Sequence, residues 1–193
     1  MSSIIDNRDD NTLLNGLQIL SAGGREVSIA TAFFSLDALL LLADTLAGYD
    51  RIRILFGDDA SHSQRKKLLQ MLRQVSDADL LVQREAMPNL TPLRKVEGLF
   101  KAGRVEARCY TARKFHAKAY LINRPTNAPP KLGIIGSGNF TRPGLTQNSE
   151  LNVKLYEEQT AQLDGWFGDR WDEAAADVVT DDVLAEIRRQ IDL

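Results

Sequence analysis

The chain has 193 residues, of which 44% are hydrophobic and 26% are charged, and its formal net charge is −2 at pH 7. These values are ordinary for a soluble globular protein, and the length suits one full domain rather than two. A single cysteine, Cys109, excludes an internal disulfide. The N-terminal MSSIIDNRDD lacks the apolar core of a signal peptide, and LDALLLLADTLAG is too short to span a bilayer. We therefore expect a cytoplasmic protein with no membrane partner.

The first half of the chain alternates between strand and helix patterns. Residues 27–35 (VSIATAFFS) and 51–57 (RIRILFG) predict strands, the first of them buried. Residues 36–47 have helical spacing and stop before Gly48, and residues 63–75 (SQRKKLLQMLRQV) predict an amphipathic helix with a serine cap and a basic face.

The second half begins with a helix from Thr91-Pro92 to about Gly103, because a proline suits the first helical turn. Strands are expected over residues 105–110, 114–123, 131–136 and 150–156, and helices from Glu157 and again from Thr180. This alternation predicts an α/β fold with a central mixed, largely parallel sheet flanked by helices. We expect one domain over 1–193, with a helical C-terminal extension at about 157–193.

Charge is unevenly distributed along the chain. Between Arg94 and Lys118 there are eight basic residues against two acidic ones, namely Arg94, Lys95, Lys101, Arg104, Arg108, Arg113, Lys114 and Lys118 against Glu97 and Glu106. From Glu157 onward there are eleven acidic residues against three arginines. Two solvated faces of opposite sign would explain the pattern, and so would a basic segment that attracts a polyanion. Net charge does not decide between these readings.

The stretch from Phe115 to Leu155 carries the clearest chemistry. In a strand, alternate side chains share a face, so Phe115, Ala117, Ala119 and Leu121 would point into the core while His116, Lys118 and Tyr120 point the other way. An ammonium beside an imidazole packs poorly, since the charge must be solvated or paired. The pair suits a phosphate, because the lysine can neutralise an oxygen while the imidazole reaches phosphorus.

A turn with two glycines follows the next strand. Gly136 and Gly138 would let the backbone approach a bound group, and Ser137 and Asn139 can donate hydrogen bonds to phosphate oxygens. Glu150 could then accept a hydrogen bond from the second nitrogen of the histidine, which would fix its tautomer. Taken singly, His116 could be a core histidine, Ser137 and Asn139 turn formers, and Glu150 a partner of a lysine.

Together, His116-x-Lys118, the Gly136-Ser137-Gly138-Asn139 turn and Glu150 resemble the signature of the phospholipase D superfamily. TQNSE after GSGNFT looks like the small bacterial endonucleases of that superfamily. VSIATAFFS, RIRILFG and WFGDRWDEAAADVV look like the phospholipase-D-like domain at the N-terminus of some helicases. The family motif continues to an aspartate at the position of Asn123, and the resemblance implies that this position supports local structure.

The resemblance implies a metal-independent phosphodiesterase, with His116, Lys118, Ser137, Asn139 and Glu150 as catalytic residues. Gly136, Gly138, Arg113 and Lys114 would bind the substrate, and no cofactor or metal is expected, since His62, Asp58 and Asp59 lack a metal-ligand pattern. The family's chemistry uses two histidines, one as nucleophile and one as acid. This chain has one His-x-Lys, so a homodimer with a shared active site is expected.

Two functions follow from these expectations. The resemblance implies a nuclease that acts through a phosphohistidine, and both the basic segment and the likeness to the bacterial endonucleases favour DNA as its substrate. The alternative is a catalytically weak or inactive nucleic-acid-binding module of a helicase or restriction system, because Asn123 replaces the motif aspartate.

Overall fold

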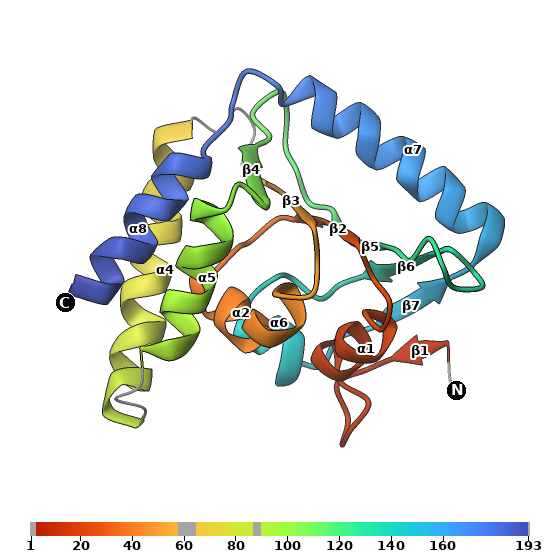
Figure 1. Cartoon of the computed structure of the whole chain (residues 1–193), viewed down its shortest axis with the longest axis horizontal. Helices are drawn as coiled ribbons and strands as arrows, with labels where there is room; N and C mark the ends of the chain where they lie inside the picture. Colours follow the sequence, from red (N-terminus) through yellow and green to blue (C-terminus); the bar gives the residue numbers. More distant parts are fainter. Residues whose placement is uncertain (1–2, 58–64, 87–89, 193) are drawn as a thin grey trace.

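The structure is a computed structural model that describes residues 3–57, 65–86 and 90–192 (Figure 1). A seven-stranded sheet runs through the molecule in the order β1-β7-β6-β5-β2-β3-β4. The strands are β1 (Ile4–Ile5), β2 (Glu26–Thr31), β3 (Arg51–Phe56), β4 (Val105–Cys109), β5 (Lys118–Asn123), β6 (Lys131–Gly136) and β7 (Asn152–Leu155). The predicted α/β class is confirmed.

The sheet is mixed, as predicted, but it is not largely parallel. The pairs β2–β3 and β3–β4 are parallel, whereas β2–β5, β5–β6, β6–β7 and β1–β7 are antiparallel. The reason lies in the connections, because β5 and β6 are joined by the short segment 124–130. Such a connection allows only an antiparallel return, while a parallel neighbour needs a long crossover.

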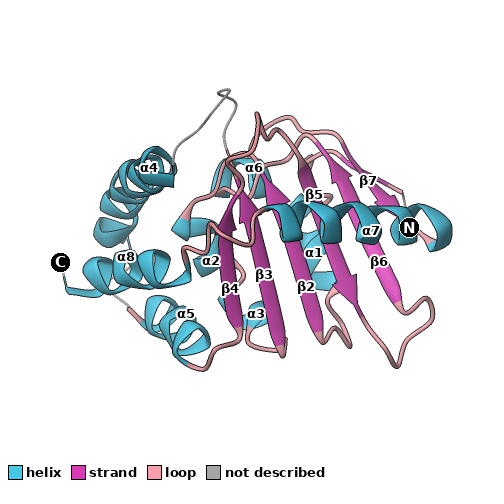
Figure 2. Ribbon diagram, turned by 90° about the horizontal axis from the view of Figure 1, so that it is seen from above, coloured by secondary structure: helices cyan, strands magenta, loops and turns pink. Residues whose placement is uncertain are grey.

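Helices cover both faces of the sheet (Figure 2). Helix α7 (Glu157–Glu173) crosses one face alone, and the opposite face carries α1 (Leu13–Leu20), α2 (Leu36–Leu41), α3 (Ala43–Leu46) and α6 (Arg142–Thr146). Three further helices gather beside β4: α4 (Arg65–Ala86), α5 (Thr91–Lys101) and α8 (Thr180–Asp192). The predicted helix starts at Thr91, Glu157 and Thr180 are confirmed.

Two apolar clusters hold these layers together. Side chains alternate along each strand, so neighbouring residues join different clusters. In β2, for example, Ile29 belongs to the larger cluster and Ala30 to the smaller one, which lies under α7. The members of the smaller cluster are Ala30, Leu55, Tyr110, Phe115, Ala119, Leu121, Phe167, Trp171 and Ala174. Because both faces are covered, central strands such as β2 are buried over nearly their whole length.

Several element boundaries differ from the prediction. The first strand ends at Thr31 rather than at residue 35, and the helix expected over 36–47 is interrupted at Leu42, which lies outside helical geometry (φ −101°, ψ 8°). Strand β5 begins at Lys118 rather than at 114. The sequence analysis missed β1, α1 and α6, which have two, eight and five residues. Segments this short carry little periodicity, and tertiary contacts decide their conformation.

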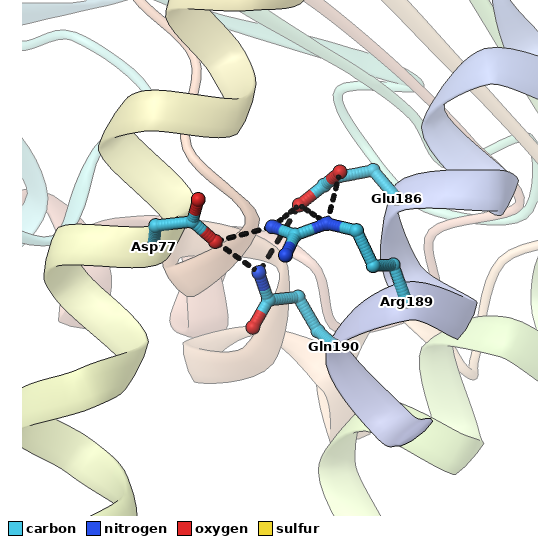
Figure 3. A network of polar contacts seen from close by, with 4 residues as sticks. All are labelled: Asp77, Glu186, Arg189 and Gln190. Atoms are coloured by element: carbon cyan, nitrogen blue, oxygen red, sulfur yellow. Dashed lines mark hydrogen bonds and ion pairs between the residues drawn. The ribbon is translucent and has the colours of Figure 1, made fainter. Parts of the chain in front are cut away.

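Polar contacts dock α4 against α8 (Figure 3). Asp77 of α4 accepts hydrogen bonds from Arg189 and from Gln190 Nε2 (2.8 Å), while Glu186 accepts from Arg189 Nε at 2.9 Å. The predicted serine cap at residue 63 lies outside the described residues. In the described part of the chain, no helix is long and apolar enough to cross a membrane.

Candidate active site

The predicted site residues gather at one edge of the sheet. Strand β5 runs antiparallel to β2 and β6, so its first residue, Lys118, lies opposite Thr31 at the end of β2, and Ala119 lies opposite Ile135 of β6. Strand β7 begins where β6 ends, with Asn152 opposite Gly136. The start of β5, the ends of β2 and β6 and the start of β7 therefore meet at this edge.

His116 and Lys118 lie in direct contact there. The Nζ of Lys118 is 3.0 Å from both ring nitrogens of His116 and 3.2 Å from its carbonyl oxygen. His116 is exposed, whereas Lys118 is only 8% exposed. An oxyanion that accepts a hydrogen bond from this ammonium would therefore sit directly beside the imidazole.

The sequence-based prediction of alternating sides holds for this stretch with one addition. Phe115, Ala119 and Leu121 belong to the cluster under α7, as expected. Tyr120 shares the side of Lys118, but it is buried in the larger cluster and donates a hydrogen bond from its hydroxyl to the carbonyl of Gly138 (2.9 Å). Burial, and then the charge of Glu150, raise the pKa of Tyr120, so its hydroxyl remains a donor that supports the turn.

Glu150 has different partners from the expected one. Its carboxylate accepts hydrogen bonds from the hydroxyl of Ser137 and from Asn148 Nδ2 (3.2 Å). Ser137 is thus a partner of Glu150 that the sequence did not suggest. The Ser137 oxygen in turn accepts the backbone N–H of Leu151 at 2.9 Å. Its proton is thus directed to Glu150 rather than to a ligand.

Asn139 is bound through its oxygen alone. Its Oδ1 accepts the backbone N–H of Phe33 at 3.2 Å and lies 3.4 Å from the hydroxyl of Thr31. Its Nδ2 donates to none of the residues that the structure describes, and the side chain is half-buried. This amide NH₂ is therefore left to donate to a ligand.

The two glycines of the turn permit close contact within the chain. A Cβ on Gly136 would lie 2.3 Å from the carbonyl oxygen of Leu151, and one on Gly138 would lie 2.7 Å from Leu13 Cδ2. The N–H of Gly138 is taken by Asn152 Oδ1 at 3.1 Å, and Gly138 is buried. The expected direct contact of Gly138 with a substrate does not fit this burial, whereas Gly136 is exposed and faces the groove.

A groove of about 510 Å³ opens beside His116 and Lys118. Its wall is largely apolar: Ile4, Val153, Ile135 and Ala119 lie opposite one another across four strands, and Leu163 and Trp166 of α7 line it from above. At its rim, Ile4 is 40% exposed and Leu151 is 63% exposed. The polar site therefore borders an open apolar surface.

The basic segment does not form one face toward the site. On α5, Lys95 pairs with Asp44 and Lys101 with Glu97, while Arg108 pairs with Glu106 beside Trp171. Arg113 and Lys114 are the members that lie on the loop before His116, and both are exposed. Arg113 also contacts the Tyr110 hydroxyl, which, with the charge of Glu173, raises its pKa. The reading of solvated, paired charges therefore fits Lys95 and Lys101 of α5, whereas Lys118 and the loop residues Arg113 and Lys114 are the members at or next to the site.

Asn123 lies at the other end of β5 from the site. It is five residues beyond Lys118, or about 16 Å at the usual rise of a strand. There it lines a polar pocket of about 150 Å³ together with Arg53, Lys131 and others. Asn123 is therefore separated from the phosphate-binding residues by the length of β5.

Possible metal ligands complete the list of predicted residues. His62, Asp58 and Asp59 lie outside the described residues. Within the described ranges, no group of three or more His, Cys, Asp or Glu residues is arranged to hold a metal ion.

Sequence reasoning missed several residues of this edge. Thr31 and the backbone of Phe33 hold Asn139, and Asn152 holds Gly138. Two signals were available: Thr31 is a polar residue at the end of a strand that was predicted to be buried, and Asn152 follows Glu150 at strand spacing. The hydrogen bond from Phe33 comes from its backbone N–H, which every residue except proline has, so the identity of residue 33 could not predict it.

Comparisons with known proteins place this geometry in a family. The family model described as "Cardiolipin synthase, PLD-like domain" matches residues 17–171. Among curated proteins, none matches the chain.

Solved structures give weaker similarities. Nuc from Salmonella typhimurium, a phospholipase D family member, is 15% identical with a TM-score of 0.48 over 83% of this chain and 85% of its own. NucT from Helicobacter pylori is 13% identical with a TM-score of 0.49, over 83% of this chain and 88% of its own. Polyphosphate kinase from Porphyromonas gingivalis is 12% identical with a TM-score of 0.50, over 85% of this chain and 24% of its own. At such identities a structural likeness concerns the fold alone.

The family match spans most of the sheet and includes the His116–Lys118 pair and the start of β7. The chain therefore belongs to the PLD-like domains of the phospholipase D superfamily, whose members are phosphodiesterases.

Proposed function

We propose that this chain is a metal-independent phosphodiesterase, and specifically a nuclease that cleaves DNA through a phosphohistidine intermediate. The observation that supports it most is the contact between the Lys118 ammonium and the His116 imidazole, 3.0 Å apart at an open groove. The same edge offers the Asn139 amide as a neutral donor. Residues 1–193 would form a single PLD-like domain.

In the first step, a ring nitrogen of His116 attacks phosphorus, so that an N–P bond forms as the P–O bond to the leaving strand breaks. Lys118 and Asn139 stabilise the charge on the non-bridging oxygens. The leaving oxygen takes a proton from a second histidine. In the second step, water attacks phosphorus, the N–P bond breaks, and the second histidine receives a proton from that water.

The second histidine would come from another copy of the chain. The single His-x-Lys pair leaves the general acid unfilled, and the apolar rim with Ile4 and Leu151 adjoins His116. We propose that two copies associate across this rim, so that both His116 side chains face one phosphate. Burial of the exposed aliphatic side chains would favour the association.

DNA is the proposed substrate because exposed Arg113 and Lys114 directly precede His116. Cations at this loop can bind backbone phosphates on either side of the scissile one. They do not read bases, so we propose cleavage without sequence specificity.

Turnover of bis(p-nitrophenyl) phosphate and of single- and double-stranded DNA in excess EDTA tests the proposal. We expect all activity to survive the chelator and to disappear in His116→Ala. DNA binding by the wild-type protein without any turnover would instead support the non-catalytic binding module. Activity that needs an added divalent ion would contradict the metal-independent mechanism.

A further inference from the structure

The end of β2 holds Asn139 in a fixed orientation. Two groups contact its amide oxygen: the backbone N–H of Phe33 at 3.2 Å and the hydroxyl of Thr31 at 3.4 Å. We call Thr31 and the Phe33 amide the Thr31 clamp. Neither belongs to the motif residues between 116 and 150.

The clamp determines which end of the Asn139 amide faces the site. A backbone N–H can only donate, so the atom opposite Phe33 must be the carbonyl oxygen. This removes the usual ambiguity between oxygen and nitrogen of an asparagine. The NH₂ group must then point away from Phe33, and it donates to no described residue.

Thr31 is itself held on several sides. It is fully buried, and its hydroxyl accepts the N–H of Phe140 (2.9 Å). Its single proton goes to the nearer acceptor, the carbonyl of Phe33 (2.7 Å), rather than to Asn139 Oδ1 (3.4 Å), so Thr31 acts on Asn139 by fixing the Phe33 backbone. These bonds tie the end of β2 to the residue after Asn139. Thr31 also pairs with Lys118 across the antiparallel β2–β5 ladder. One buried residue thus connects the two proposed phosphate ligands, Lys118 and Asn139.

We propose that Thr31 is a positioning residue for the reaction: its hydroxyl locks the loop so that the Asn139 NH₂ points at a phosphoryl oxygen next to Lys118. The inference rests on the proposed function for its substrate and deepens it by one element outside the motif. A donor that is already oriented needs no reorganisation when negative charge develops, which is the condition for effective stabilisation.

Three variants separate orientation from packing. Thr31→Val keeps the shape but removes the hydroxyl, Thr31→Ser keeps the hydroxyl but removes the methyl, and Asn139→Ala removes the donor itself. Thr160→Val is the matched control, because Thr160 is also buried (1% exposed) and lies on α7, and its hydroxyl bonds to none of the residues that the structure describes.

We expect Thr31→Val to lower kcat/KM for bis(p-nitrophenyl) phosphate about a hundredfold, the scale of a small misplacement of a catalytic group. The loss should fall on kcat, Thr31→Ser should recover most of it, and Thr160→Val should show none. In the Asn139→Ala background, Thr31→Val should add no further loss, because the donor that it orients is already absent. Equal losses in both backgrounds would overturn the proposal and leave Thr31 a structural residue.

A measurement without turnover separates this proposal from the proposed function. Inorganic phosphate should shift the side-chain NH₂ resonances of Asn139 in the wild-type protein, but not in Thr31→Val at a temperature where both are folded. That result in a protein without turnover would reject the phosphodiesterase and retain the clamp. Unshifted Asn139 resonances at saturating phosphate, in an active enzyme, would reject the clamp and retain the phosphodiesterase.

Discussion

At the scale of single residues, each of the proposed ligands has a distinct environment. Lys118 is buried beside an exposed His116, and among the described residues the Asn139 side chain is bound only through its oxygen. Ser137 and Glu150 bind each other. The ammonium and the Asn139 amide are thus the groups poised for an anion, while Ser137 and Glu150 fix the loop and the start of β7.

Replacement of Lys118 tests whether its ammonium stabilises the transition state. We expect Lys118→Ala to lower kcat/KM, with a loss of about 2–4 kcal/mol in transition-state stabilisation. This is the usual cost of losing one preorganised stabilising group. Lys118→Arg should recover only part, because a planar guanidinium does not fit the same space. Steady-state kinetics in EDTA give both numbers, and unchanged kcat/KM in Lys118→Ala would refute its role.

Asn123→Asp restores the aspartate of the family motif. We expect no change in kcat/KM, because Asn123 lies at the far end of β5 from Lys118. The new carboxylate would be attracted by Arg53 and Lys131 and repelled by Glu26 and Asp164, all of which line the same pocket. The free energy of unfolding should therefore rise by at most about 1 kcal/mol, as for an exposed ion pair. Urea unfolding and kinetics test both expectations, with the exposed Asn127→Asp as the control. A large gain in activity would mean that the natural chain is a weakened enzyme.

At the scale of elements, α6 follows the Gly136–Asn139 turn and is fixed to α2 by an ion pair. Arg142 binds Asp37 through two nitrogens, one at 2.8 Å from Oδ1, and Asp37 is only 1% exposed. We expect Asp37→Ala to destabilise the protein by about 3–5 kcal/mol, because it leaves a partly buried guanidinium without that carboxylate. Urea unfolding of Asp37→Ala measures this, and the double variant Asp37→Ala/Arg142→Met should recover part of the loss. A cost below about 1 kcal/mol would show that the pair is as weak as an exposed one.

The contact between α4 and α8 should depend on pH (Figure 3). The hydrogen bond from Arg189 is the main cause that lowers the pKa of Asp77. A carboxyl with a folded pKa below the unfolded value of about 3.9 stabilises the fold fully above that value and loses this effect as pH falls through its folded pKa. We therefore expect the protection of the α4 amides, corrected for the intrinsic exchange rate at each pH, to fall at acid pH well before that of the central strands.

Asp77→Asn should remove that acid dependence, and the exposed Asp181→Asn at the start of α8 should keep it. Because Asp77 and Arg189 remain partly exposed, added salt should weaken the wild-type contact. Identical exchange of α4 in the wild type and in Asp77→Asn at every pH would contradict the role of the pair.

Sequence patterns predicted the long elements and the motif, but not how the pieces meet. Strands such as β3 and helices such as α5 have strong local patterns, and His116, Lys118 and Asn139 lie at one edge of the sheet. The partner of Glu150 and the orientation of Asn139 depend on contacts between residues far apart in the chain. Such contacts arise from tertiary packing, to which local propensity is blind.

At the scale of the whole molecule, the account requires two copies. We expect Leu151→Lys to place a charge in the proposed dimer contact and so to shift the dimer toward monomer. Activity should fall in parallel, because a monomer lacks the His116 that the other copy would supply. Ile19→Lys is the matched control, since Ile19 is 55% exposed on α1 and away from the groove. Light scattering at several concentrations measures the mass. A fully active wild-type monomer near 21.5 kDa would contradict the shared site.

The central claim is that His116 forms a covalent bond to phosphorus without a metal. Mass spectrometry of protein that is rapidly denatured during turnover of an oligonucleotide in excess EDTA tests it most directly. The account predicts a nucleotidyl adduct on His116, absent in His116→Ala and reduced in Lys118→Ala. Cleavage in EDTA with no adduct at any time point, or an adduct on another residue, would contradict it.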